Sequence, residues 1–395
     1  MLPTARGPDG LTASRVERIA YLDHAATTPM CAEAVAAMLP YLVEHYGNPS
    51  GGHAVARSAL RALDEAREEL ALLLGAGPGG LVFTSGGTEA DNLAVFGVLA
   101  GPDGACVPGS VLCSAVEHPA VLEACRAAGG RTIGVDGHGQ IDLDALAEAL
   151  DETVRLVSVM LVNNETGVRQ PLDAVVALVH GLAPQALVHT DAVQAFSWID
   201  LAEATAGADL VSLSAHKFGG PKGVGALLAR DRASRLRPIL HGGPQERERR
   251  AGTQNVPGIV AMAAAAKASA RDREVAGVRV RDLATRLVEG LRGSLGGVHE
   301  AVRREDRIDA ICNLGVEGVE AEELLVVLDE LGVCASAGSA CASGAIDPSH
   351  VLVAMGLTPQ EAKHHVRLSL GHATTAADID AALLAFPKAV ERLRA

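Results

Sequence analysis

Residues 156–162 read Leu-Val-Ser-Val-Met-Leu-Val, the most apolar stretch of strand length in the chain. Such a continuous apolar run is typical of a strand that is buried on both faces of a parallel sheet. Further apolar runs of strand length lie at 81–84, 110–114, 187–190, 210–213 and 225–229. Stretches with helical period alternate with them, as at 54–74, 143–151 and 171–181. The pattern therefore predicts an α/β fold with a mostly parallel sheet and helices on both faces.

The character of the sequence changes after about residue 255. An Ala-rich stretch, 260–270, runs into 271–295, which has helical period and interspersed charge, and short strands and helices follow. We therefore expect a second, smaller α+β domain that a long helix joins to the first. The predicted parts are a flexible N-terminal arm (1–20), a large domain (32–260) and a small domain (21–31 with 261–395).

Composition narrows the class of protein. The chain has 395 residues, 48% of them hydrophobic and 21% charged, which fits two or three folded domains and excludes a disordered chain. The net charge of −14 and the low aromatic content disfavour a nucleic-acid or anionic membrane partner. No run of 18 apolar residues and no apolar signal segment is present, so we expect a cytoplasmic protein.

Seven cysteines are present, at positions 31, 106, 113, 125, 312, 334 and 341. None forms a Cys-x-x-Cys pair and their number is odd, so neither a disulfide framework nor a zinc finger fits. Cys341 lies in a run of nine small residues, 336–344, which predicts a mobile loop from which a thiol could reach a substrate. The alternative is a small buried cysteine in a turn.

A Gly-rich turn follows the predicted strand at 81–84. Its sequence, Ser85-Gly86-Gly87-Thr88-Glu89, leads into a helical stretch. Such a junction offers unpaired backbone N–H groups and the positive end of a helix dipole, and Thr88 adds a hydroxyl. No Gly-Lys-Ser/Thr follows, so the turn is not a P-loop. It predicts a phosphate site, or else a tight turn with a helix cap.

Two charged residues follow other predicted strands. Lys217, in Ser214-Ala215-His216-Lys217, can be partly desolvated and so nucleophilic, although most lysines in Gly-rich loops are surface residues. Asp191 lies where ligands bind in open α/β sheets. It could pair with a protonated ring nitrogen, or cap the next helix.

Three further polar residues follow or lie in apolar segments. His118 could stack on a flat cofactor or transfer a proton, or be an ordinary half-buried histidine. Asn164 could bind a ligand or belong to a polar turn. Arg367 could hold a carboxylate in a bidentate pair, or be a surface charge on a strand. Together with the phosphate turn and the lysine, these residues meet the needs of pyridoxal phosphate bound to an amino acid.

The motifs, in this order, resemble those of the cysteine desulfurases (NifS/IscS-like), which are fold-type I pyridoxal-phosphate enzymes of the class-V aminotransferase family. The resemblance covers nearly all of the chain after Ala20. Its motifs are 21–29 (YLDHAATTP), 47–50 (GNPS), 85–89 (SGGTE), 163–165 (NNE), 214–217 (SAHK), 242–246 (GGPQE), 250–253 (RAGT), 338–341 (GSAC) and 367–369 (RLS). It implies a large domain with a mostly parallel seven-stranded sheet and a smaller α+β domain.

The resemblance also implies the roles of the site residues. Lys217 would bond to the cofactor and transfer a proton, His118 would stack on its ring and act in catalysis, and Cys341 would be the nucleophile. The cofactor-binding residues would be Gly87, Thr88, Asp191, Gln194, Ser214, His216, Lys217 and Thr253, the last reaching the cofactor of a partner subunit. Asn164 and Arg367 would bind the substrate.

The reaction that the resemblance implies converts L-cysteine into L-alanine, with the sulfur captured as a persulfide on Cys341. A sulfur-acceptor protein, such as an iron–sulfur scaffold, would take the persulfide sulfur, and a homodimer is expected. Cys341 would then be a candidate transient iron–sulfur ligand. The alternatives are a selenocysteine lyase or a small-amino-acid aminotransferase of the same fold. Residues 1–20, Pro244 and Ala342 depart from the family pattern.

Overall fold

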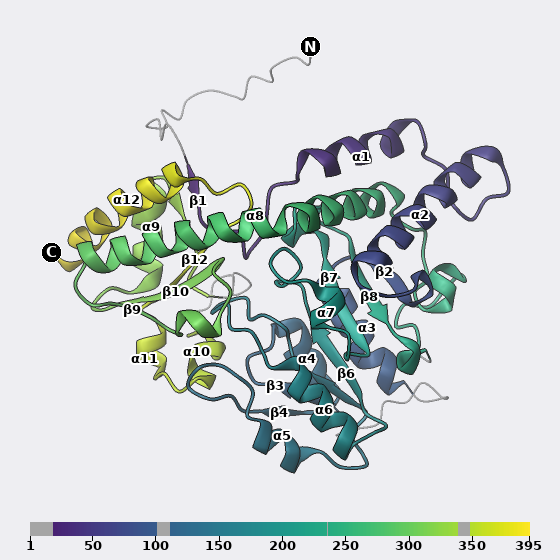
Figure 1. The fold of residues 1–395 in the computed structure, drawn as a ribbon, viewed down its shortest axis with the longest axis horizontal. Helices are drawn as coiled ribbons and strands as arrows, with labels where there is room; N and C mark the ends of the chain where they lie inside the picture. Colours follow the sequence, from purple (N-terminus) through teal and green to yellow (C-terminus); the bar gives the residue numbers. More distant parts are fainter. Residues whose placement is uncertain (1–18, 101–110, 235, 339–347) are drawn as a thin grey trace.

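The computed structural model describes residues 19–100, 111–234, 236–338 and 348–395 (Figure 1). Its centre is a seven-stranded sheet with the order β2-β8-β7-β6-β5-β3-β4. The strands are β2 (Leu81–Thr84), β3 (Val111–Ser114), β4 (Arg131–Ile133), β5 (Leu156–Ser158), β6 (Leu187–Asp191), β7 (Leu210–Ser214) and β8 (Gly225–Ala229). Only β8 runs antiparallel to its neighbours, β2 and β7. The mostly parallel sheet predicted from the sequence is therefore confirmed.

The apolar run at 156–162 forms a shorter strand than predicted, because β5 ends at Ser158. Beyond it, the backbone N–H groups of Val159 and Leu161 still donate to carbonyls of β6. On the β3 side, however, the N–H of Met160 donates to the carboxylate of Glu117 at 2.6 Å. The continuous apolar pattern thus indicates that the whole segment is buried. In its second half, the Glu117 side chain takes the place of the backbone hydrogen bonds to β3.

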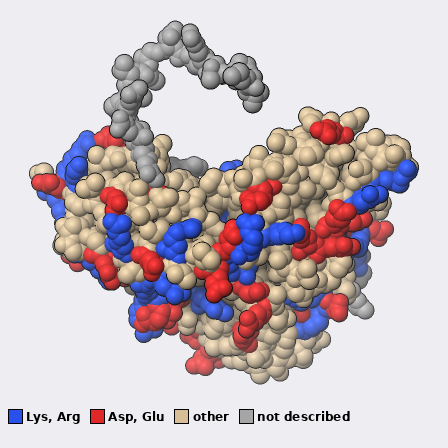
Figure 2. All heavy atoms as spheres, turned by 45° about the horizontal axis from the view of Figure 1, so that its top comes forward, with Lys and Arg blue, Asp and Glu red and all other residues tan. Residues whose placement is uncertain are grey.

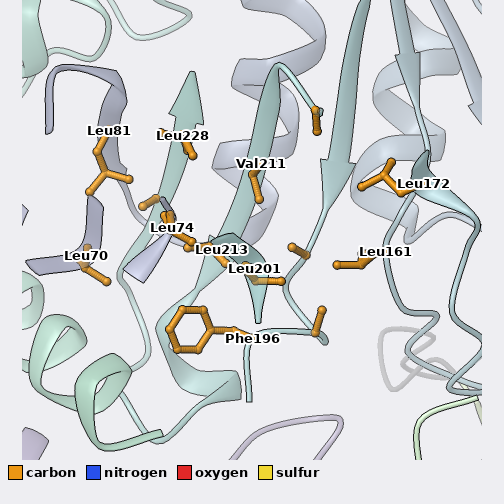
Figure 3. Close-up of a cluster of buried hydrophobic side chains, with 14 of the residues drawn as sticks. Leu70, Leu74, Leu81, Leu161, Leu172, Phe196, Leu201, Val211, Leu213 and Leu228 are labelled. Atoms are coloured by element: carbon orange, nitrogen blue, oxygen red, sulfur yellow. The ribbon is translucent and has the colours of Figure 1, made fainter. Parts of the chain in front are cut away.

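Helices cover both faces of the sheet, as predicted. They are α2 (Ala54–Leu73), α3 (Gly87–Leu99), α4 (Pro119–Ala127), α5 (Leu143–Ala149), α6 (Leu172–Leu182) and α7 (Leu201–Ala204). Apolar residues of α3 and α4 pack with Val82, Leu210 and Leu227 on one face. Leu81, Val211 and their neighbours point to the other face and join the cluster that includes α2 and α6 (Figure 3). This alternation follows from the two-residue period of a strand.

A 39-residue helix, α8 (Val256–Ser294), runs from the sheet to a smaller unit (Figure 1). Its first half packs against α1 (Ala32–Val43) and α2, and its second half packs against α12 (Ala376–Arg394). Accordingly Met262 belongs to the core of the sheet and Leu287 to the core of the smaller unit. The expected domain division at residue 260 remains a prediction, and it falls inside this helix.

The smaller unit holds two short sheets. One has the order β12-β10-β9, and the other pairs β1 with β11 in parallel. Its strands are β1 (Ala20–Tyr21), β9 (Val298–Glu300), β10 (Ile311–Val316), β11 (Val333–Cys334) and β12 (His365–Ser369), and its helices are α9 (Ala321–Glu330), α10 (His350–Ala354), α11 (Pro359–Ala362) and α12. Leu22, just after β1, is buried in the core of this unit. The first described residues of the chain therefore pack in the same core as its C-terminal helix α12.

The charged side chains of the surface are interspersed, acidic beside basic, over the face that Figure 2 shows. The described part of the chain contains no helix whose length and hydropathy would suit it to span a bilayer.

Candidate active site

A cavity of about 240 Å³ lies at the carboxyl ends of the central strands. It is lined by Ala25, Ala26, Gly87, Thr88, Asp91, His118, Met160, Asn164, Asp191, Val193, Gln194, Ser214, His216, Lys217 and Arg367. Each predicted site residue that the structure describes is among them, with the exception of Thr253.

The topology explains this convergence. The lining residues follow β2, β3, β5, β6 and β7 in turn, and these strands all point the same way. Polar loops at their carboxyl ends therefore meet at one edge of the sheet, where open α/β folds bind ligands. Arg367 reaches the same cavity from β12 of the smaller unit.

The Gly-rich turn suits a phosphate group. Helix α3 begins at Gly87, and a Cβ placed on this residue would lie 3.0 Å from Val193 Cγ2 and 3.5 Å from Ser214 Cβ. Only a residue without a side chain leaves room there for an anion to approach the helix N-terminus. The hydroxyls of Thr88 and Ser214 line the same end of the cavity.

His216 completes this donor set without adding charge. Its Nδ1 lies 3.2 Å from Thr27 Oγ1. Burial, helped by the positive charges of Lys217 and Lys222, lowers the pKa of His216 to about 4. At neutral pH the ring is therefore a neutral hydrogen-bonding group.

Asp191, at the end of β6, is a buried carboxylate aimed at the cavity. Its Oδ1 accepts a hydrogen bond from Val193 N at 2.8 Å. Burial raises the pKa of Asp191, while His118 and Lys217 act in the opposite direction. A cationic partner would therefore stabilise its ionised form, and a protonated ring nitrogen would be such a partner.

A second buried carboxylate, Asp91 on α3, was not anticipated from the sequence. It lines the cavity, and burial and the charge of Asp191 raise its pKa well above the usual value. Its Oδ1 has no hydrogen-bond partner and lies 3.7 Å from His189 Nε2. The spacing of Thr88 and Asp91 is the signal that could have revealed it, because residues three apart share a helix face.

Lys217 and Gln194 are both anchored to the segment after β1. Lys217 Nζ donates to the carbonyls of Ala25 at 2.5 Å and Ala26 at 2.9 Å. Gln194 Nε2 donates to the same Ala25 carbonyl at 2.8 Å. These two backbone carbonyls hold the amine of Lys217 at the cavity wall.

His118 caps α4 and also lines the cavity. Its Nδ1 accepts a hydrogen bond from Ala120 N at 3.1 Å. Because burial lowers the pKa of His118, the ring is neutral and its one proton sits on Nε2. That nitrogen is the one able to give or take a proton in the site.

Arg367 is 2% exposed, which excludes the alternative of a surface charge. Its Nη2 donates to Asp23 Oδ1 at 2.8 Å, and its Nη1 donates to the carbonyl of Asn164 at 3.0 Å. Its Nε is buried without a partner. An oriented guanidinium with a donor to spare is suited to binding a carboxylate.

Of the two remaining predicted residues, one does not line the cavity and the other lies outside the described residues. Thr253 is exposed, in the loop that precedes α8. Cys341 lies outside the described residues, so its nucleophilic and metal-binding roles stay predictions. Within the described ranges, no group of three or more His, Cys, Asp or Glu residues is placed to hold a metal ion.

Comparisons with known proteins agree with this geometry. The model of the Aminotransferase class-V family matches residues 20–382. A protein of Gluconacetobacter diazotrophicus called cysteine desulfurase is 42% identical over 381 residues, covering 95% of this chain and 94% of that protein. The cysteine desulfurase IscS of Methanosarcina thermophila is 39% identical over 393 residues, with 98% and 95% covered. A solved structure of a NifS-like protein has a TM-score of 0.86 at 32% identity, covering 95% of this chain and 100% of that one.

Proposed function

The chain belongs to the cysteine desulfurases of the class-V aminotransferase family, and we propose that it converts L-cysteine into L-alanine and captures the sulfur as a persulfide on Cys341. The enzyme depends on pyridoxal 5′-phosphate. The observation that carries the proposal is the convergence, in one cavity, of the phosphate turn, Asp191, Lys217 and the buried Arg367.

The residues present fit this cofactor. Gly87 leaves the approach to the α3 N-terminus open, and Thr88, Ser214 and His216 supply donors for the phosphate. Asp191 is the buried carboxylate for the ring nitrogen, and because burial raises the pKa of Asp191, a protonated ring nitrogen would stabilise its ionised form. Gln194 would hold the ring oxygen. When bound, the cofactor draws electrons from the substrate's Cα and makes its proton acidic.

The side chains of the chain do the rest. Arg367 binds the substrate carboxylate, aided by Asn164. Lys217 Nζ would hold the cofactor, and it would take the Cα proton of the substrate and return it. His118 lines the same cavity, and its imidazole would exchange a proton with the substrate.

The sulfur step needs a thiolate. The Sγ of Cys341 attacks the substrate's sulfur, the bond between that sulfur and its β-carbon breaks, and the carbon takes up a proton. Cysteine and one enzyme thiol thereby become alanine and one persulfide, without an external oxidant. A sulfur-acceptor protein then removes the outer sulfur.

A homodimer is part of the proposal. Helix α1 and the segment just after it expose several apolar side chains, namely Val35, Leu39, Leu42, Val43 and Tyr46. An exposed apolar face of this kind supports association with a second copy. Thr253, exposed in its own chain, would then serve the partner's cofactor. We assign the activity to the cytoplasm, with an iron–sulfur scaffold as acceptor and Cys341 as a transient cluster ligand.

The deciding experiment compares the wild-type protein with Cys341→Ala. Yellow protein that releases alanine and, with a reductant, sulfide is expected for the wild type. The variant should stay yellow and make neither product. Cys334→Ala, a control at a half-buried cysteine in β11, should stay active. If Cys341→Ala turns over, the selenocysteine lyase or aminotransferase alternative takes its place, since neither needs this thiol.

A further inference from the structure

Three consecutive residues within the loop 242–254 adopt a left-handed backbone conformation. The φ angles are +46° at Glu246, +55° at Arg247 and +64° at Glu248, and within the described ranges no other residue except glycine has a positive φ. This conformation is unfavourable for residues with a Cβ and persists where the surroundings enforce it, commonly at functional sites.

A buried ion pair enforces it here. The Glu246 side chain is 1% exposed, and its two oxygens accept hydrogen bonds from Arg67 Nη1 and Nη2, both at 2.8 Å. Phe83 N donates to the same carboxylate at 2.9 Å, and the Arg67 guanidinium lies over the Phe83 ring, 4.6 Å from its centroid. These contacts tie the strained turn to α2 and β2, and they hold the pKa of Glu246 below its usual value despite the burial.

Further contacts hold Arg247 in the turn and the two arginines that follow it. Arg247 Nη1 donates to the Pro78 carbonyl at 3.2 Å, and Arg249 Nη2 donates to the Gly79 carbonyl at 2.5 Å. Arg250 pairs with Glu89 at 2.8 Å, and Glu89 in turn accepts from Ser85 N at 2.7 Å. The turn and the two residues after it are thereby tied to segments next to the large sheet.

The end of the loop that precedes α8, called its tip, contributes no residue to the lining of the chain's own cavity. Gly252 and Thr253 are exposed, and neither lines the cavity. One further contact shapes the tip: Gly252 N donates to Gln245 Oε1 at 3.0 Å, directly before the strained turn. These contacts fix the backbone that carries an exposed hydroxyl, that of Thr253. Such fixing is understandable if the hydroxyl acts outside its own chain.

We propose that Glu246 is a positioning residue that acts in trans. Through Arg67 it holds residues 246–248 in the left-handed conformation, and so presents Thr253 to the phosphate of the cofactor bound by a second copy of the chain. This inference rests on the proposed function, including the homodimer. It adds that the strained turn of one subunit governs cofactor affinity in the other.

Mixed dimers with two affinity tags test it. One subunit carries Lys217→Ala, so only the other subunit can form the coloured covalent complex with the cofactor. When Glu246→Gln is placed on the Lys217→Ala subunit, the apparent Kd of pyridoxal phosphate at the intact site should rise about tenfold, as for one lost charge-assisted hydrogen bond. When Glu246→Gln is placed on the subunit that keeps Lys217, the Kd should stay within about twofold of that of the mixed dimer in which both subunits keep Glu246.

Two further variants make the result decisive. Thr253→Ala should reproduce the trans pattern, and Glu248→Gln, at an exposed residue of the same turn, should change nothing. If Glu246→Gln does not fold, Gln245→Ala loosens the tip without touching the ion pair and should give a smaller loss, again only in trans. A loss that follows the substitution in cis, or is equal in both arrangements, overturns the inference. A fully active monomer overturns the homodimer itself, and absence of alanine production overturns the proposed function.

Discussion

Glu165 and Ser349 are joined across 184 positions of sequence, because the Ser349 hydroxyl donates to Glu165 Oε2. The same oxygen lies close to Gly338, where a Cβ would stand only 2.8 Å away. Gly338 and Ser349 lie at the two described ends of the segment that contains Cys341. Glu165 also follows Asn164, whose carbonyl holds Arg367. One buried carboxylate thus links the substrate subsite to both ends of the cysteine segment.

We expect Glu165→Ala to slow persulfide formation on Cys341 about tenfold, because Ser349 loses the acceptor that holds one side of the cysteine segment. Glu165→Gln keeps an acceptor oxygen and should retain most of the rate. Transfer of labelled sulfur from cysteine in a single turnover measures this. The cofactor absorbance of both variants is the control: if it falls in parallel with the rate, Glu165 supports the fold and not the cysteine segment.

Arg367→Lys should raise the KM for L-cysteine at least about tenfold, since an ammonium cannot form the bidentate pair with a carboxylate. Asp23→Asn removes the charge that orients the guanidinium and should have a smaller effect in the same direction. Steady-state kinetics with cysteine would check both. An unchanged KM in Arg367→Lys would show that the substrate carboxylate binds elsewhere.

Gly87→Ala should lower the affinity for pyridoxal phosphate about tenfold, because the new methyl group meets Val193 and Ser214 at the mouth of the phosphate turn. Alanine is the better helix former, so the free energy of unfolding of the cofactor-free protein should not fall. Titration of the cofactor-free protein measures the affinity. Gly181→Ala, in α6 and with open space around its Cα, is the matched control.

His189 should make stability depend on pH. It lies fully buried between Ser158 Oγ at 2.8 Å and Ser212 Oγ at 2.9 Å, and burial lowers the pKa of His189 from 6.5 to about 3. Between these values the unfolded chain takes up a proton that the folded chain refuses, so the unfolding free energy falls as the pH falls.

Urea unfolding from pH 6 to pH 4 would measure this dependence. In His189→Gln its slope should be smaller by about 1.4 kcal/mol per pH unit, the equivalent of one proton. His241→Gln, at an exposed residue, should keep the slope of the wild type. Equal slopes for all three proteins would mean that His189 is protonated in the folded state.

The sequence predicts the sheet well because buried parallel strands are continuous apolar runs, as at β5 and β7. It misses β4 at the edge, where Arg131 and Thr132 are exposed and no apolar run forms. It also overextends β5, since burial continues past Ser158 while one side of the ladder ends. Hydropathy indicates which segments are buried. It does not indicate which distant segments supply their hydrogen-bond partners, and so it does not show where a strand ends.

The same limit applies to the site. Lys217, Asp191 and Arg367 could be named because each belongs to a local motif. The partners that lie far away in the sequence could not be named. Asp23 pairs with Arg367 across 344 positions, and Glu246 pairs with Arg67 across 179 positions. Asp91 sits on a helix face whose counterpart, His189, is a strand residue. Such pairings depend on the tertiary fold, which the local pattern does not contain.

The helix α8 has a consequence for how the protein comes apart. With 39 residues it spans about 58 Å and belongs to both cores, as Met262 and Leu287 illustrate. If one core unfolded alone, the apolar side chains of its half of α8 would be exposed to water while the other half stayed packed. Unfolding of the two cores is therefore coupled. Heating should therefore give one shared calorimetric transition, and fragments cut at the expected boundary should be insoluble alone but complement each other when coexpressed.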